Sequence, residues 1–191
     1  METRNYQCHN NELTKEEVKL RLITSALEAA RWDKETQIRM EYGFTDGRFI
    51  VYSNAKPARG GRKKADYLLY YKSNLPLAIV EAKDNKHSLG AGMQQGLEYA
   101  AILDIPFVYS SNGNGFLEHD MDKGAEREIV LDEFPSPDEL WSRHKSNKNI
   151  TPEQEKLITE PYYYQHGDKP ERRHQLYPRG NCTRSAPYHD N

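Results

Sequence analysis

Two short apolar runs near the middle of the chain, residues 67–71 and 77–80, are separated by a polar segment. Their length and their branched and aromatic side chains are typical of buried β-strands rather than helices. Residues 72–74 predict a turn, and Pro76 lies at a strand start, where its missing N–H does least harm. Because consecutive strands usually pair, we expect these two runs to form an antiparallel hairpin.

Periodic patterns on both sides of this hairpin predict an α/β domain with a mixed central β-sheet flanked by helices. Thr14 followed by Glu17 is a capping-box pattern, and it opens an amphipathic helix that we expect to reach residue 31. Alternation over residues 37–42 and 48–52, with a turn at 45–47, predicts a second hairpin. The remaining expected elements are helices at residues 90–103 and from Pro137, and strands at residues 105–111, 116–120 and 128–130.

The composition suits one globular domain with loose ends. The chain has 191 residues, a hydrophobic fraction of 36% and a formal net charge of -2. We expect a flexible N-terminus over residues 1–12, a single domain over 13–145, and a linker or tail over 146–191. Cys8 and Cys182 have no metal-ligand spacing and are expected to be free thiols in a reducing cytoplasm. The sequence has no signal-peptide pattern and no apolar run of membrane-spanning length, so we expect no membrane partner.

Three charged residues flank the central hairpin: Asp66 precedes the first run, and Glu81 and Lys83 follow the second. We expect Asp66 at the beginning of its strand and the other two at the end of theirs, about 6–7 Å apart on one face. Two adjacent carboxylates favour a hard divalent cation such as Mg²⁺, and the lysine could orient or deprotonate a water molecule or stabilise developing charge. Glu41, in the second hairpin, could reach this site or face the solvent. The alternative for the whole cluster is a set of solvated strand ends.

A basic stretch at residues 56–64 leads directly into the first of these carboxylates. It holds five basic residues and no acid, and its glycines predict a flexible loop. Arg59, Arg62, Lys63 and Lys64 would lie at the mouth of the site, where they could hold a DNA phosphate backbone without reading base sequence. Because the net charge is -2, any contact with DNA has to come from such a local patch. A solvated run of charges is the alternative interpretation.

In combination these motifs resemble the PD-(D/E)xK nucleases. Asp66 and the E-A-K triplet at residues 81–83 match the catalytic motif, although alanine precedes Asp66 where the ideal motif has proline. The segment Q-G-L-E-Y at residues 95–99 matches the Q-x-x-x-Y helix motif of the RecB-like branch. The surrounding sequence is similar, from about residue 13 to about residue 144, to the N-terminal nuclease domain of the restriction (R) subunit of type I restriction-modification enzymes. The segments that carry this similarity are GRKKADYLLYY, LAIVEAKDN and GMQQGLEYAAILDIPFVYSSNG.

The resemblance implies a restriction-endonuclease-like fold and magnesium-dependent hydrolysis of phosphodiester bonds in double-stranded DNA. In the roles that it implies, Asp66, Glu81 and the Ala82 carbonyl hold Mg²⁺, and Lys83 places or activates the attacking water. The implied supporting residues are Gln95 and Tyr99, which would back up the site or touch DNA, and Glu28, a first-helix glutamate of the kind that joins the metal site in some related nucleases.

The resemblance also implies partners, namely double-stranded DNA and separate methylation and specificity subunits that would recognise the base sequence. In the family an ATP-driven translocase follows this domain, and no G-x-x-x-x-G-K-S/T motif occurs in the sequence, so ATP is expected only for the full-length subunit. Residues from about 170 onward do not match what the family places there, which suggests a truncated or frame-altered product. Two other interpretations remain: a stand-alone repair-type nuclease of the same superfamily, and a non-catalytic DNA-binding or subunit-docking module.

Overall fold

The computed structural model of the chain describes residues 12–45, 49–50, 58–59 and 61–160, with the backbone alone at 49–50 and 58–59. The described residues up to Thr159 belong to one compact unit. The predicted flexible N-terminus up to residue 11, the end of the turn at 45–47, both cysteines and the tail from residue 161 lie outside the described residues. Within the described part, no helix has the length and apolar character needed to cross a membrane.

Six strands of the described part form one mixed sheet, as expected. They are β1 (Ile38–Thr45), β4 (Arg62–Lys72), β5 (Leu75–Ala82), β6 (Phe107–Ser111), β7 (Phe116–Asp120) and β8 (Ala125–Ile129), arranged in the order β1-β4-β5-β6-β7-β8. All neighbours are antiparallel except β5 and β6, which are parallel and are joined through a helix. Two further short strands, β2 (Phe49–Ile50) and β3 (Ala58–Arg59), pair only with each other among the described residues.

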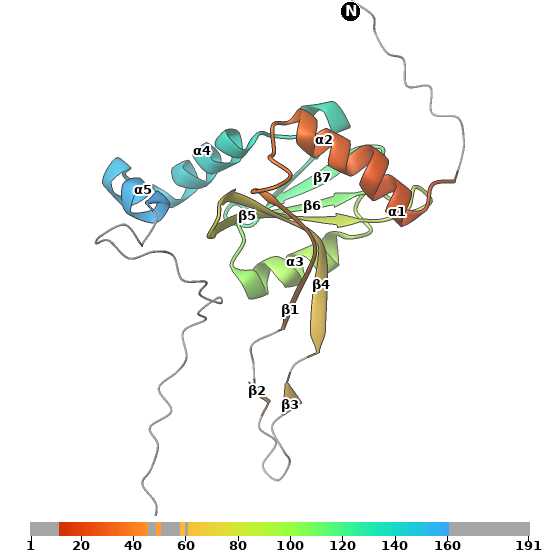
Figure 1. Ribbon diagram of the computed structural model, residues 1–191, viewed down its shortest axis with the longest axis horizontal. Helices are drawn as coiled ribbons and strands as arrows, with labels where there is room; N and C mark the ends of the chain where they lie inside the picture. The colour runs from red at the N-terminus through yellow and green to blue at the C-terminus, as the bar shows by residue number, and fades with distance from the viewer. Residues whose placement is uncertain (1–11, 46–48, 51–57, 60, 161–191) are drawn as a thin grey trace, which may run out of the picture. The chain divides into compact units, whose positions relative to one another are not determined.

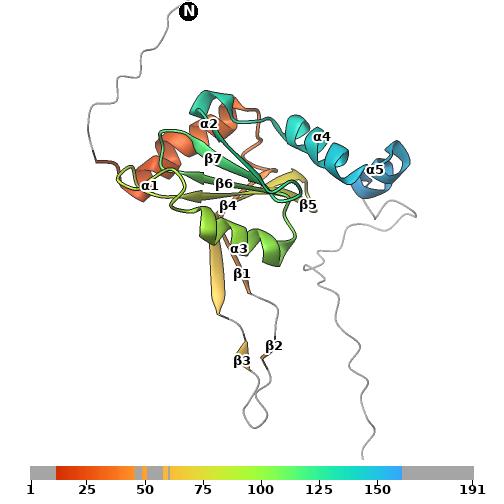
Figure 2. The ribbon, with the colours of Figure 1, turned by 180° about the vertical axis from the view of Figure 1, so that it is seen from behind.

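Helices cover both faces of the sheet (Figures 1 and 2). One face carries a continuous helical run, made of α1 (Lys15–Glu17), the π-helix η1 (Val18–Ile23) and α2 (Thr24–Ala29), together with α4 (Pro137–Lys148). The opposite face carries α3 (Met93–Leu103). The short 3₁₀ helix η2 (Leu131–Glu133) precedes α4, and α5 (Pro152–Thr159) follows it. The predicted capping box at the start of α1 is confirmed, because Glu17 N–H donates to Thr14 Oγ1 at 3.3 Å and Thr14 N–H donates to Glu17 Oε2 at 3.1 Å.

The central hairpin, formed by β4 and β5, lies between two hydrophobic cores, one on each face of the sheet. Tyr67 and Leu69 of β4 pack toward α2 and α4, whereas Leu68 packs toward α3 with Ile79 of β5. Burial on both faces explains why β5 reads as a continuous apolar run rather than an alternating one. The helix α3 comes close to the sheet at Gly96, where an added Cβ would lie only 2.5 Å from Val108 Cγ1.

The prediction that residues 37–42 form a hairpin with residues 48–52 is wrong. Residues 38–45 pair with β4 along its length, from Ile38 opposite Leu69 to Thr45 opposite Arg62. Of the latter, the described residues 49–50 pair with β3 instead. The alternation correctly predicted strands, but the partner depended on the length of β4, which starts at Arg62 and so offers β1 a complete edge.

The C-terminal part of the described chain is held by aromatic and polar contacts. Ser136 caps α4, and Trp141 in this helix is buried and stacks on Tyr71 of β4, with ring centroids 5.0 Å apart. The helix α5 lies in the segment where a linker was expected, and its Glu155 accepts hydrogen bonds of 2.7 Å from both Trp141 Nε1 and Lys145 Nζ. The domain boundary predicted at residue 145 stays a prediction, but helical structure continues to Thr159.

A buried carboxylate links three strands of the sheet to α4. Glu118 of β7 is 1% exposed and receives hydrogen bonds from Arg143 (2.6 and 3.0 Å), Arg127 (2.9 and 3.2 Å) and the Tyr109 hydroxyl (2.6 Å). Burial alone would raise its pKa, but the hydrogen bonds from Arg143, Arg127 and Tyr109 outweigh burial and lower the pKa to about 2. The ionised form of Glu118 is therefore the stabilising one.

We expect Glu118→Gln to lower the free energy of unfolding by about 3 kcal/mol at neutral pH, because the pKa is lowered from 4.5 to about 2 on folding. This contribution is complete above pH 4.5 and is lost as the pH falls toward 2, so the difference from wild type should shrink in acid. Urea unfolding at several pH values measures it. Glu126→Gln, at a half-exposed carboxylate that contacts His119, is the control and should change little; a pH-independent loss for Glu118→Gln would contradict the assignment.

Candidate active site

The two predicted carboxylates meet between β4 and β5. Tyr67 is opposite Val80 in the register, which places Asp66 opposite Glu81. The backbone N–H of Asp66 donates to Glu81 Oε1 at 3.3 Å, and the backbone N–H of Ala82 donates to Asp66 Oδ2 at 2.9 Å. Both side chains are buried, with Asp66 6% and Glu81 1% exposed. Because β4 begins at Arg62, Asp66 lies inside this strand and not at its beginning as predicted.

The two carboxylates have opposite protonation tendencies. Burial, together with the nearby charge of Asp66, raises the pKa of Glu81 to about 8. Burial also pushes the pKa of Asp66 upward, but the Lys15 hydrogen bond and the Ala82 N–H outweigh it, so this pKa is lowered. At neutral pH the pair therefore carries about one negative charge. Among the described residues nothing donates a hydrogen bond to Glu81 Oε2, although this oxygen is buried.

The predicted lysine, Lys83, forms a side-chain hydrogen bond with α3. Lys83 follows β5 directly, and its Nζ donates to Gln95 Oε1 at 3.3 Å. Gln95 Nε2 in turn donates to the Tyr99 hydroxyl at 3.0 Å. The two residues expected to support the site therefore contact Lys83 and each other, and they share one face of α3 because they are four positions apart. Close approach of the segment before α3 depends on Gly92, where an added Cβ would lie 3.0 Å from Glu81 Cβ.

Two lysines of the first helical run contact Asp66, and neither was predicted from the sequence. Lys15 Nζ lies 2.8 Å from Asp66 Oδ2, and Lys19 Nζ lies 3.6 Å from Asp66 Oδ1. Lys19 also forms an ion pair with Glu41 of β1, which shows that Glu41 does reach the neighbourhood of the site. The available signal was the four-residue spacing of Lys15 and Lys19, which places both on one helix face. Only the packing of this face against β4 shows that they contact Asp66.

Glu28 is not part of the cluster. Its side chain is exposed and lies 3.6 Å from Lys34 Nζ, near the end of α2 rather than near Asp66. Another carboxylate of the first helical run, Glu16, does lie near the cluster, with its Oε2 3.7 Å from Lys19 Nζ. The structure therefore does not bring Glu28 to the carboxylates, because it follows Lys19, the nearer of the two lysines that contact Asp66, by about two and a half helical turns.

The basic residues near the site lie on strands rather than in the predicted flexible loop. Arg62, Lys63 and Lys64 begin β4, where Arg62 and Lys64 are exposed and Lys63 is half-buried. Lys64 pairs with Glu41, and Lys63 Nζ lies 5.7 Å from the centroid of the Tyr99 ring. Arg59 belongs to β3, and its side chain lies outside the described residues. This end of β4 pairs with β1 and not with β5, so it extends past the central hairpin (Figure 1).

The residues present fit a divalent cation only through a small ligand set. No group of three or more His, Cys, Asp or Glu side chains with metal-binding spacing occurs in the described part of the chain. The set formed by Asp66, Glu81 and the Ala82 carbonyl contains two carboxylates and one main-chain oxygen. The buried, unpaired Glu81 Oε2 favours such a ligand, while Lys15 already contacts Asp66. A cation at this position would have to take the place of Lys15.

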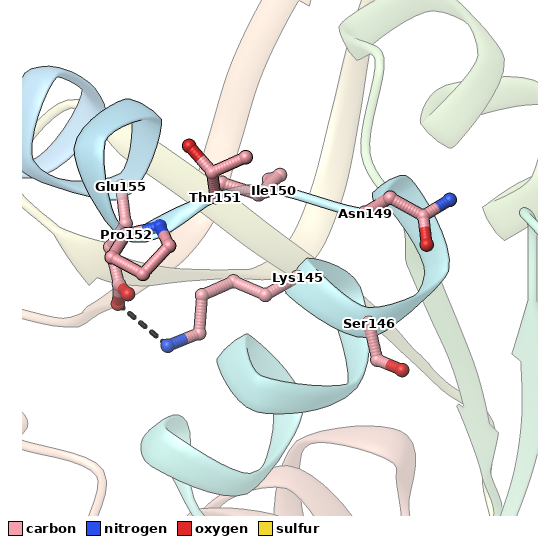
Figure 3. A pocket seen from close by; sticks show the side chains of 7 residues that line it. All are labelled: Lys145, Ser146, Asn149, Ile150, Thr151, Pro152 and Glu155. Carbon is pink, nitrogen blue, oxygen red and sulfur yellow. Dashed lines mark hydrogen bonds and ion pairs between the residues drawn. The ribbon is translucent and has the colours of Figure 1, made fainter.

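A surface pocket elsewhere in the described part does not belong to this cluster. It lies between α4 and α5 (Figure 3), with the Lys145–Glu155 ion pair on one side. None of its lining residues is among the predicted site residues. The lining residues are Lys145, Ser146, Asn149, Ile150, Thr151, Pro152 and Glu155.

The mixed six-stranded sheet, with α3 on its parallel connection and helices on both faces, is a restriction-endonuclease-like fold. The model of the type I restriction enzyme R protein N terminus matches residues 28–135, more than half of the chain. The chain belongs to this family.

Two relatives support the same assignment. A type I restriction enzyme EcoAI endonuclease subunit from Escherichia coli is 44% identical over 168 residues, which cover 86% of this chain and 21% of the relative. The solved fragment of an HsdR subunit of a type I restriction enzyme from Vibrio vulnificus is 37% identical, with a TM-score of 0.68, and the match covers 80% of this chain and 29% of that one. The chain therefore spans about a fifth of the length of the curated relative that it matches.

The raised pKa of Glu81 predicts how stability depends on pH. In the metal-free protein the protonated form is the stabilising one, so its contribution is complete below pH 4.5 and is lost as the pH rises through about 8. We expect Glu81→Gln to remove this dependence and to be more stable than wild type near pH 8, by on the order of a few kcal/mol. Urea unfolding in the presence of a chelator measures this.

Glu118→Gln is a matched control for this experiment, because the pKa of Glu118 is lowered and its pH dependence has the opposite sign. If wild type and Glu81→Gln show parallel stability profiles between pH 4.5 and about 8, the buried carboxyl does not hold its proton in the way described.

Proposed function

We propose that the chain is a magnesium-dependent endonuclease domain of a type I restriction enzyme R subunit, and that it hydrolyses phosphodiester bonds of double-stranded DNA. The observation that carries the proposal is the contact of Asp66 with Glu81 across β4 and β5, with Glu81 Oε2 buried and unpaired within the described residues. Two buried carboxylates at this distance are costly unless a proton or a cation compensates them. Family membership supports a nuclease role in general terms.

In this proposal Asp66, Glu81 and the Ala82 carbonyl hold Mg²⁺, which when bound would lower the pKa of a water ligand and neutralise phosphate charge. Glu81 must first give up the proton that it holds at neutral pH, and Lys15 must leave Asp66 Oδ2. Lys83 follows Glu81 by two positions in the chain, and in this proposal its ammonium orients the attacking water or stabilises the charge that develops on the phosphate. The hydrogen bonds through Gln95 and Tyr99 limit the positions open to the Lys83 side chain.

The DNA backbone would lie along the start of β4. Arg62 and Lys64 are exposed there, Lys63 stands over Tyr99, and we include Arg59 of β3 as a contact with the phosphates. Such contacts supply salt-dependent affinity without base specificity. We propose that base recognition belongs to methylation and specificity subunits in the cytoplasm, and that ATP acts only on a full-length subunit, since this chain covers 21% of its curated relative.

One observation favours a second candidate function. The ion pair between Lys15 and Asp66, at 2.8 Å, leaves Asp66 compensated without any metal. If this pair is permanent, the chain is a non-catalytic module that binds DNA or docks onto partner subunits. Measurements of metal binding and of DNA cleavage separate the two candidates.

We expect Asp66→Ala to abolish binding of Mn²⁺ or Mg²⁺, and Lys83→Ala to retain it while lowering plasmid cleavage by about a hundredfold or more. The metal site needs the carboxylate, whereas the lysine acts on water and phosphate. Isothermal titration calorimetry measures the first effect, and the rate of nicking of supercoiled plasmid measures the second. Lys86→Ala is the control, because Lys86 is exposed and pairs with Glu12. A wild-type chain that binds neither cation supports the non-catalytic candidate.

Lys15→Met should increase the affinity for divalent cations severalfold, up to about tenfold, because the cation no longer displaces a charged hydrogen-bond donor from Asp66. Titration calorimetry with Mn²⁺ measures the change. Lys34→Met makes the same substitution at an exposed lysine that lies near Glu28, and should leave the affinity unchanged. Weaker binding by Lys15→Met would instead show that Lys15 assists the cation.

A further inference from the structure

Two irregular stretches of backbone come together beside Asp66. Lys19 lies in the π-helix η1, a form of helix that is rare and is frequent at functional sites. Glu41 has a φ of 56°, a left-handed conformation that a residue with a side chain rarely adopts inside a paired strand. The side chains of these two residues form an ion pair with each other. Each irregularity therefore contributes one partner of the same contact.

The ammonium of Lys19 has three carboxylates around it. Its side chain is fully buried, and its Nζ donates a hydrogen bond to Glu41 Oε1. Asp66 Oδ1 lies at 3.6 Å and Glu16 Oε2 at 3.7 Å, both beyond hydrogen-bond distance. The other oxygen of Glu41, Oε2, pairs with Lys64. The ammonium of Lys19 is therefore closer to the carboxylate of Glu41 than to that of Asp66.

A buried charge without a partner is costly. A buried ammonium needs an anion as a partner, and of the three carboxylates here only Asp66 is buried, since the side chains of Glu41 and Glu16 are 38% and 70% exposed. Without Glu41, the ammonium of Lys19 would pair with Asp66. Lys15 can leave Asp66 for solvent because its side chain is 39% exposed, but Lys19 is enclosed and cannot. A cation would then compete with a fixed positive charge.

We propose that Glu41 is a positioning residue that holds the ammonium of Lys19 away from Asp66, and so leaves Asp66 able to accept a divalent cation. The inference rests on the proposed metal site at Asp66 and Glu81. Glu41 is not itself a ligand of the cation in this arrangement, because both of its oxygens are engaged by lysines. Its effect on the cation passes through Lys19.

The test is a titration of the 191-residue chain with Mn²⁺ by isothermal calorimetry, for wild type, Glu41→Gln and the double variant Lys19→Met, Glu41→Gln. We expect Glu41→Gln to weaken Mn²⁺ binding about tenfold or more, and the double variant to return to within about threefold of wild type. Restoration is expected because the second substitution removes the ammonium that would occupy Asp66. Glu28→Gln, which makes the same change at an exposed carboxylate near Lys34, should bind as wild type does.

Each other outcome overturns the inference in a recognisable way. If both Glu41→Gln and the double variant bind weakly, Glu41 is itself a ligand; if Glu41→Gln binds as wild type does, it has only a structural role. If wild type does not bind Mn²⁺, or binds it equally well as Asp66→Ala, the proposed metal site fails together with the inference. Melting temperatures measured with a chelator separate loss of folding from loss of binding. If Lys19→Met prevents folding, the double variant Lys19→Gln, Glu41→Gln supplies two neutral amides for the same comparison.

Discussion

The site depends on the reciprocal contact between Asp66 and Glu81 at the junction of β4 and β5. Each carboxylate accepts a backbone N–H from the opposite strand, Asp66 from Ala82 and Glu81 from Asp66 itself. The pairing of the strands therefore fixes both side chains, and both are buried where the cost of a second negative charge is high. A proton, a lysine or a metal ion can reduce this cost. The chemistry open to the site follows from which of these compensates the pair.

Two buried glutamates of the described part, Glu118 and Glu81, differ in their surroundings. Glu118 is enclosed by Arg127, Arg143 and Tyr109, and its four hydrogen bonds with the arginines complete its shell. Such an acid stabilises the sheet and has no position left for a ligand. Glu81 is equally buried but keeps one oxygen without a partner in the described structure, and burial raises its pKa instead of lowering it. Unpaired buried polar atoms and shifted pKa values of this kind are common at functional sites.

The two lysines near Asp66 differ in how deeply they are buried. Lys15, at the surface, contacts Asp66 directly, whereas the fully buried Lys19 is held mainly by Glu41. An exposed ammonium exchanges readily with solvent and with a cation, and an enclosed one does not. In the ion pair of Lys19 with Glu41, Glu41 has a left-handed backbone and Lys19 lies in the π-helix. Lys15 is therefore the lysine in direct contact with Asp66, while the ammonium of Lys19 is closer to Glu41 than to Asp66.

The local elements of this protein could be read from the sequence because their causes are local. The apolar runs of β4 and β5, the capping box at Thr14 and the i, i+4 spacing of Gln95 and Tyr99 each depend on neighbouring residues, and all are present in the structure. The meeting of Asp66 with Glu81 was also predictable, since a short hairpin allows few registers. Other features depend on contacts between distant segments. The pairing of β1 with β4, the lysines that surround Asp66 and the exclusion of Glu28 were decided by how the first helical run packs on the sheet. Periodicity shows which face of a helix is buried, but not which strand residue that face meets.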